Sequence, residues 1–215
     1  DDLTLPAYEV FKNRGNEILE FKATNSYTVV VRRGYADNTE QIMAVCYDPF
    51  LSPVWTVRDK FHDPTELTMT NALVTYTDSN AVLVLFVCGK GFTAYNIGPD
   101  GSMQWQLNDE QAQSVGAGIS YAVQADGVFY VIGYYSSVLT AISPDGRFLW
   151  ECSCDDENIY WPYYIEPVNE GIYVYWDGGV ESTDNTLVWR VLFSYDGQYV
   201  STDLVKDPQL NQGLT

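Results

Sequence analysis

Short apolar runs recur along this chain, and clusters of turn-forming residues separate them. The runs are rich in β-branched and aromatic residues, a composition that is typical of β-strands. The clearest examples are "VLVLFVC", "GVFYVIGYY", "GIYVYW" and "TLVWRVLF". No stretch longer than a loop has the periodicity of an α-helix, so the pattern predicts an all-β chain.

Two sets of turn signals divide these runs at regular intervals. Turns that end in Asp-Gly stand at 98–101, 143–146 and 194–197. Proline presets φ for the second position of a type I turn, and glycine accepts the positive φ that returns the chain to a strand through a bulge. A second set stands further upstream, at 24–26, 78–80, 125–127 and 169–171. Both sets indicate β-hairpins, with a strand on each side of every turn.

Tryptophan marks a repeat along the chain. Trp55, Trp105 and Trp150 are 50 and 45 residues apart. Four antiparallel strands in each period of 40–50 residues are typical of a β-propeller blade. We expect the three indole rings to fill the gaps between neighbouring blades, because a single sheet cannot cover its own two faces.

This pattern predicts the organisation of the whole chain of 215 residues. Residues 18–205 are expected to form a single β-propeller domain, preceded by an N-terminal arm (1–17) and followed by a C-terminal tail (206–215). The four predicted blades span about 18–58, 72–107, 119–152 and 161–203.

The repeat itself is similar to a known one. "TAISPDGRFLWE" at 140–151 resembles the repeat of PQQ-like, quinoprotein-type β-propellers, in which Ala, then Asp or Ser, and a Gly turn precede Trp. "YNIGPDGSMQWQ" is similar but has Asn96 in place of the Ala. "LFSYDGQYVS" keeps Asp-Gly and lacks Pro and Trp, whereas "VCYDPFLSPVW" keeps Trp55 and lengthens the turn without Gly. The resemblance implies a four-bladed propeller of four-stranded antiparallel blades.

The resemblance does not imply a catalytic role. Quinone-dependent dehydrogenases of this family have about eight blades and need calcium ligands and a catalytic carboxylate. No residue of this chain matches those positions, so we expect no cofactor. Binding or assembly scaffolds are the other kind of family member, and they suit a short chain better.

Charge excludes several classes of partner. The chain has 29 acidic and 11 basic side chains and a formal net charge of −18. Nucleic acid needs clustered Lys and Arg, and an anionic membrane repels such a surface. No apolar run approaches the roughly 20 residues of a membrane span. A cationic partner, a metal ion or a neutral ligand such as a glycan remains open, and so does a role of the charge in solubility alone.

The reactive side chains favour no enzyme and no metal site. Cys46, Cys88, Cys152 and Cys154 permit two disulfides, but their spacing does not choose the pairs, and we favour free buried thiols. His62 is the single histidine, which makes the Cys-x-Cys motif a poor zinc site. No nucleophile, phosphate-loop or metalloprotease motif occurs.

Aromatic and acidic residues form the candidate binding surface. Tyr and Trp offer flat apolar faces with a polar edge, which suit sugar rings and protein partners alike. The alternative is that alternate members of the cluster pack into blade interfaces. The candidate residues are Tyr134, Tyr135, Tyr160, Trp161, Tyr163, Tyr164, Asp155, Asp156 and Glu157.

The sequence therefore predicts a non-enzymatic binding or scaffold module that contacts a protein or glycan through an acidic, aromatic loop rim, in an extracellular or cell-surface setting. One alternative is a structural component of a larger extracellular or viral assembly, as an oligomer or assembly subunit. The other is a carbohydrate-active enzyme that uses paired carboxylates such as Glu20 and Glu166 on innermost strands.

Overall fold

The computed structural model describes most of the chain in ten segments. These are residues 17–24, 26–36, 39–60, 72–76, 82–88, 91–109, 119–133, 137–154, 161–177 and 187–208. The predicted arm lies outside them except for Glu17, which begins the first strand, and the predicted tail is described only as far as residue 208. By its internal contacts the chain divides into two units, 1–111 and 112–215.

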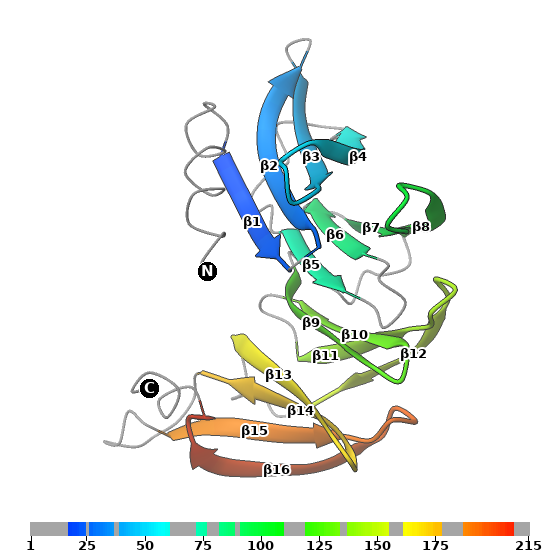
Figure 1. The fold of residues 1–215 in the computed structure, drawn as a ribbon. Helices are drawn as coiled ribbons and strands as arrows, with labels where there is room; N and C mark the ends of the chain where they lie inside the picture. Colours follow the sequence, from blue (N-terminus) through cyan, green and yellow to red (C-terminus); the bar gives the residue numbers. More distant parts are fainter. Residues whose placement is uncertain are drawn as a thin grey trace. The chain divides into compact units, whose positions relative to one another are not determined.

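The first unit contains two four-stranded antiparallel sheets, which we call blade 1 and blade 2. The strands of blade 1 are β1 (Glu17–Ala23), β2 (Thr28–Ala36), β3 (Thr39–Tyr47) and β4 (Pro53–Lys60). Those of blade 2 are β5 (Ala72–Tyr76), β6 (Val82–Cys88), β7 (Gly91–Ile97) and β8 (Met103–Asp109). The first strands of the two blades, β1 and β5, lie beside each other (Figure 1).

The second unit contains blades 3 and 4, built in the same way. The strands of blade 3 are β9 (Ile119–Ala125), β10 (Val128–Gly133), β11 (Val138–Ile142) and β12 (Phe148–Ser153). Those of blade 4 are β13 (Pro162–Val168), β14 (Gly171–Trp176), β15 (Leu187–Phe193) and β16 (Tyr199–Lys206). Here β9 and β13 are the neighbouring first strands.

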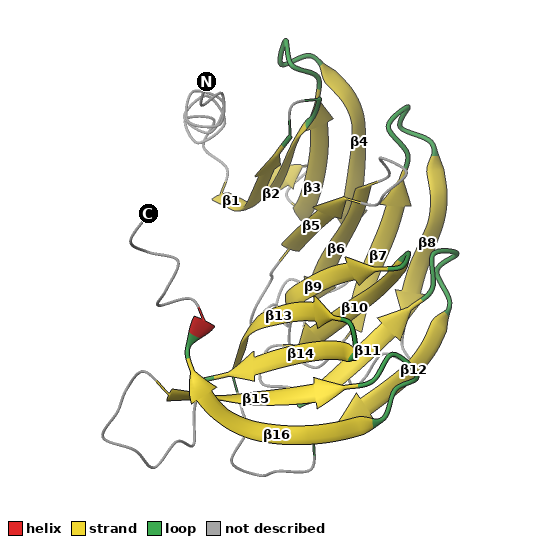
Figure 2. Ribbon diagram, turned by 60° about the horizontal axis from the view of Figure 1, so that its bottom comes forward, coloured by secondary structure: helices red, strands yellow, loops and turns green. Residues whose placement is uncertain are grey.

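The all-β class and the four-stranded antiparallel blades are confirmed. In every sheet the strands are hydrogen-bonded in chain order, so each blade is a simple meander (Figure 2). Four such sheets are the blades of the predicted four-bladed propeller. The assignment of all four to a single domain stays a prediction.

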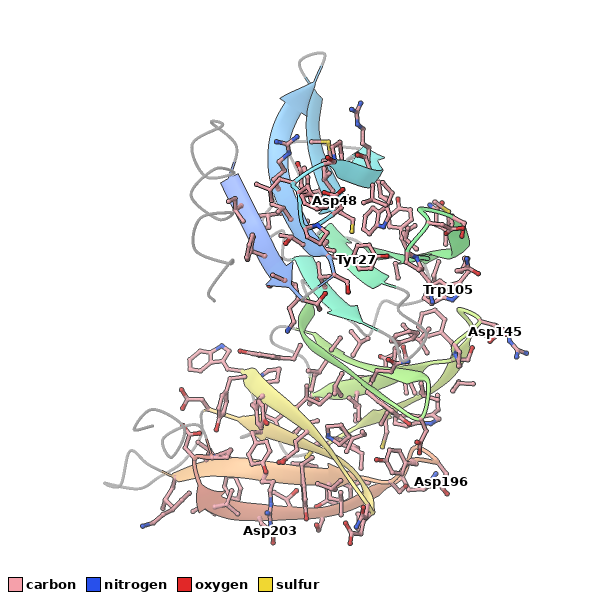
Figure 3. All side chains as sticks on the ribbon, in the orientation of Figure 1. Tyr27, Asp48, Trp105, Asp145, Asp196 and Asp203 are labelled. Atoms are coloured by element: carbon pink, nitrogen blue, oxygen red, sulfur yellow. The ribbon has the colours of Figure 1, made fainter. Side chains whose placement is uncertain are left out.

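The Asp-Gly hairpins have the expected chemistry. Gly101, Gly146 and Gly197 have φ angles of 82°, 80° and 83°, in the left-handed region that glycine adopts without strain. A bulge follows each turn, because the register shifts at the adjoining strand pair. The serine hydroxyls of the turns at 143 and 194 donate to Asp145 and Asp196, whose positions Figure 3 labels. These bonds fix the turns at one geometry.

The turn between β3 and β4 corrects one detail of the sequence interpretation. The sequence suggested a longer turn, but the hydrogen bonds show one of the same length. Leu51 N–H donates to Asp48 O, and Asp48 N–H donates to Ser52 O, as Gly146 and Ser143 do in blade 3. Leu51 therefore occupies the glycine position, and its φ of 63° is a left-handed conformation that leucine rarely adopts.

Two of the predicted tryptophans dock against glycine turns of the next blade in the chain. A Cβ added to Gly101 would lie 2.8 Å from Cβ of Trp55, and one added to Gly197 would lie 2.6 Å from Cδ2 of Trp150. The Trp150 Nε1–H also donates to the backbone oxygen of Tyr195 at 3.1 Å. The predicted packing of an indole between blades is thus confirmed for Trp55 and Trp150.

Each unit has an apolar core between its blades. In the first unit, Trp55 packs with residues of β2, β3, β5 and β7, among them Val31, Ala44, Val74 and Tyr95. In the second unit, Trp150 packs against a cluster that includes Ile132, Leu139 and Trp176. Trp105 is half-buried on β8, and its role between blades stays a prediction.

Three of the cysteines, Cys46, Cys152 and Cys154, are free thiols. Cys46 and Cys154 are buried, and Cys152 is half-buried. Burial, followed by the charge of Asp48, raises the pKa of the Cys46 thiol to about 12, so this thiol is protonated at neutral pH. Cys152 and Cys154 contact the same core cluster, as expected for residues two apart on an extended chain.

Replacing Gly197, which packs against Trp150, should lower the stability of the fold more than replacing a glycine of the same backbone conformation elsewhere. Gly127 has φ 80° and Gly197 has φ 83°, but a Cβ on Gly127 would meet only Cγ of Pro144, at 3.2 Å. We expect Gly197→Ala to lower the free energy of unfolding by at least about 1 kcal/mol more than Gly127→Ala, because the methyl overlaps the Trp150 indole. Urea denaturation of the two variants measures the difference, and equal losses would contradict the docking role.

Candidate binding surface

Blade 4 has two faces of different chemistry. Side chains alternate across a strand, so Ile172, Val174 and Trp176 of β14 point to one face and Tyr173 and Tyr175 to the other. The first three are fully buried in the core of the second unit. On its other face, β14 therefore presents tyrosine instead of aliphatic residues.

The strand register extends this polar aromatic face across all four strands. Tyr164 and Glu166 of β13 pair with Tyr175 and Tyr173. Arg190 of β15 pairs with Tyr175 on one side and with Asp203 of β16 on the other. We call this set the tyrosine face: Tyr164, Glu166, Tyr173, Tyr175, Arg190 and Asp203.

Tyr175 lies at the centre of the tyrosine face. It is 5% exposed, and its hydroxyl donates to Oε2 of Glu166 at 3.1 Å. The ring of Tyr164 lies 5.4 Å from its ring and that of Tyr173 lies 6.3 Å away, both in tilted contact. Burial, followed by the hydrogen bond to Glu166, raises the pKa of Tyr175 to about 12.

Arg190 supplies the positive charge of this face. The guanidinium carbon lies 4.3 Å from the centroid of the Tyr173 ring, a cation–π distance. The guanidinium Nη2 donates to Oδ2 of Asp203 at 3.2 Å, at the edge of the sheet where Figure 3 labels Asp203. Its buried Nε has no hydrogen-bond partner. The arginine is thus held in place from two sides.

Trp161 lies immediately before β13 and differs from its neighbours. Its side chain is 43% exposed, and its φ of 66° places the backbone in the left-handed region. The carbonyl oxygen of Trp161 accepts a hydrogen bond from the Asp177 N–H at 3.1 Å, which ties it to the end of β14. A bulky residue in this conformation is a genuine outlier. The fold therefore presents this indole to solvent at a strained position.

Of the predicted site residues, the structure describes Trp161, Tyr163 and Tyr164. Tyr134, Tyr135, Tyr160, Asp155, Asp156 and Glu157 lie outside the described residues. Tyr163 is half-buried, and its hydroxyl donates to Oδ1 of Asp207 at 3.0 Å; burial and this bond raise its pKa. Tyr164 packs on Tyr175. Tyr163 and Tyr164 therefore contact the blade itself, whereas Trp161 is exposed, and the binding role of all three stays a prediction.

The sequence interpretation did not single out Tyr173, Tyr175, Arg190 or Asp203. A signal was present, because the two tyrosines alternate in "GIYVYW" and the arginine interrupts the apolar run "LVWRVLF". A charged residue in the middle of a strand needs partners on its own face. The two partners, Tyr173 and Asp203, come from neighbouring strands. No single segment of the sequence shows which residues of these strands pair.

Other chemistry is limited within the described segments. No group of three or more His, Cys, Asp or Glu side chains lies together there in a way that suits a metal ion. Glu20 lies in the first unit, where burial raises its pKa, and Glu166 lies in the second, so their role as a catalytic pair stays a prediction. The described part of the chain contains no apolar helix of membrane-spanning length.

Known proteins resemble this chain in structure but not in recognisable sequence. No protein-family model matches the chain, and no curated protein matches it. A crystal structure of a protein of unknown function from Bacteroides caccae matches with a TM-score of 0.56 and 12% identity over 89% of this chain. A Lactobacillus plantarum protein matches with a TM-score of 0.52 and 17% identity over 83% of this chain.

Both solved structures are longer than the matched region. This chain covers 62% of the Bacteroides protein and 54% of the Lactobacillus protein. At these identities the likeness shows the fold alone, which is propeller-like.

The buried tyrosine predicts a loss of stability at high pH. Because the pKa of Tyr175 is raised from 10.0 to about 12, its contribution to stability is complete below pH 10 and is lost as the pH rises towards 12. We expect the free energy of unfolding to fall more steeply over this window in the wild type than in Tyr175→Phe. Urea denaturation at intervals across the window measures both slopes, and parallel curves would contradict the assignment.

Proposed function

We propose that this chain is a propeller of the PQQ-like repeat type that acts as a non-enzymatic binding module, contacting a protein or glycan through the surface around Trp161. The observation that carries the proposal is the exposed indole on a strained backbone. The side chain is 43% exposed, on a backbone conformation that a bulky residue rarely adopts.

The free-energy cost of the left-handed backbone at Trp161 supports a binding role. A left-handed backbone costs an L-residue about 1–2 kcal/mol, whereas glycine adopts it freely. Strained residues persist mainly where function requires them. An exposed indole suits both the apolar face of a sugar ring and the centre of a protein interface.

Bonds and packing tie Trp161 and the residues that follow it to blade 4. Tyr163 is bonded to Asp207, Tyr164 packs on Tyr175, and the Trp161 carbonyl is bonded to the end of β14. A rigid surface loses little conformational entropy on binding, which favours affinity. The net charge of −18 favours a neutral or cationic partner over nucleic acid.

The family part of the proposal rests on the repeat. The Pro-Asp-Gly turns of blades 2 and 3 and the tryptophan four residues after each glycine resemble the PQQ-like motif. Trp150 of blade 3, and Trp55 at the equivalent position of blade 1, pack against the turn glycine of the following blade. The non-enzymatic part rests on the sequence, which lacks nucleophile and phosphate-loop motifs.

Removing the exposed indole should weaken binding without unfolding the chain. We expect Trp161→Ala to weaken binding at least about tenfold for any ligand found by glycan array or partner pull-down, since a hot-spot side chain contributes about 2 kcal/mol or more. The matched control is Tyr199→Ala, which removes a ring that is 49% exposed on β16 of the same blade.

Two further measurements separate binding from folding. Trp161→Gly also removes the ring but relieves the left-handed strain, so its unfolding midpoint should lie above that of Trp161→Ala. With 5-fluorotryptophan labelling, the ¹⁹F resonance that is lost in Trp161→Phe should shift on ligand addition. Equal affinity of Trp161→Ala and wild type would contradict the proposal.

A further inference from the structure

The turn between β3 and β4 carries the most exposed large apolar side chain among the described residues. Phe50 is 88% exposed, and Leu51 and Val54 are 41% and 38% exposed. We call residues 48–54 the Phe50 turn. These three apolar side chains, close in sequence on one hairpin of the first unit, give a small apolar projection.

Hydrogen bonds hold this projection in one conformation. Oδ1 of Asp48 accepts from the N–H groups of Phe50 at 2.9 Å and Ser52 at 2.8 Å. Backbone bonds join Leu51 N–H to Asp48 O and Asp48 N–H to Ser52 O. The exposed side chains are therefore carried on a rigid turn, and ordering them on binding costs little entropy. Figure 3 labels Asp48 at its place in blade 1.

The other blades show what folding alone requires at these positions. The residues equivalent to Phe50 are Asp100, Asp145 and Asp196, and those equivalent to Leu51 are Gly101, Gly146 and Gly197. Aspartate binds a neighbouring serine hydroxyl in each of those turns, and glycine accepts the positive φ. Blade 1 instead has two exposed apolar side chains, one of them with φ 63°. Turns of the same length thus form in the other blades without apolar side chains at these two positions, which supports a role for Phe50 and Leu51 beyond turn formation.

We propose that the Phe50 turn docks into an apolar pocket, rimmed by basic side chains, on another protein. The apolar tip requires a cavity that excludes water, and the net charge of −18 on this chain favours a positive rim. The same charge disfavours a second copy of this chain and an anionic membrane, because both repel it. This surface goes beyond the proposed function, since it lies in the first unit and does not use Trp161.

Site-specific photocrosslinking in cells that make the protein tests the docking directly. The full chain carries p-benzoylphenylalanine at position 50 or, as the control, at position 199, where a tyrosine is 49% exposed. We expect one adduct specific to position 50. The captured protein is then purified, and its affinity for the wild type, Phe50→Ser, Leu51→Gly, Trp161→Ala and Tyr199→Ser is measured by calorimetry.

The expected pattern of affinities is specific. Phe50→Ser weakens binding at least about tenfold and Leu51→Gly at least about threefold, while Tyr199→Ser and Trp161→Ala bind as the wild type does. Binding also weakens between about 50 and 500 mM salt, because the charged rim is screened. Leu51→Gly keeps the turn and relieves its strain, so its loss of affinity does not come from unfolding.

Several results would overturn the proposal. These are no adduct at position 50 above the control, an adduct that is a second copy of this chain, or a captured protein whose affinity is unchanged in Phe50→Ser. Binding of phosphatidylcholine vesicles by the wild type but not by Phe50→Ser would assign the turn to a membrane surface instead. Loss of binding in Trp161→Ala but not in Phe50→Ser would place the contact at the first surface.

Discussion

The contact between a tryptophan side chain and a turn glycine organises both units of this protein. A four-stranded sheet has two faces and cannot cover both by itself, so each blade needs a neighbour. Trp55 meets Gly101, and Trp150 meets Gly197, at distances that leave no room for a Cβ atom on the glycine. The same glycine also provides the positive φ of the hairpin. One residue therefore serves the turn and the packing between blades together.

Much of the fold was predictable, because strands and hairpins have local causes. β-branched runs and Asp-Gly turns report on a few neighbouring residues, and the blade period follows from their spacing. The length of the turn between β3 and β4 was predicted wrongly, because Leu51 takes a backbone conformation that its side chain disfavours. The tyrosine face was missed, because Tyr173, Arg190 and Asp203 meet only through the register of three strands. Of the predicted site residues that are described, only Trp161 is exposed.

Departures from local rules coincide with the two surfaces to which we assign binding. Trp161 and Leu51 are bulky residues in left-handed conformations, and both are more than 40% exposed. Among the described residues the third non-glycine residue with a positive φ is Asp126, a residue type that adopts this conformation more readily. Natural sequences break such rules mainly at functional positions.

The docking of indole on glycine is tested most directly by a double-mutant cycle in the second unit, where a Cβ on Gly197 would overlap the Trp150 ring itself. Trp150→Ala, Gly197→Ala and the double variant are unfolded in urea under identical conditions. If the two groups contact each other as described, Gly197→Ala costs at least about 1 kcal/mol less in the Trp150→Ala background than in the wild type. Strictly additive losses would show that the indole and the glycine are independent, and would contradict this account of how the blades are joined.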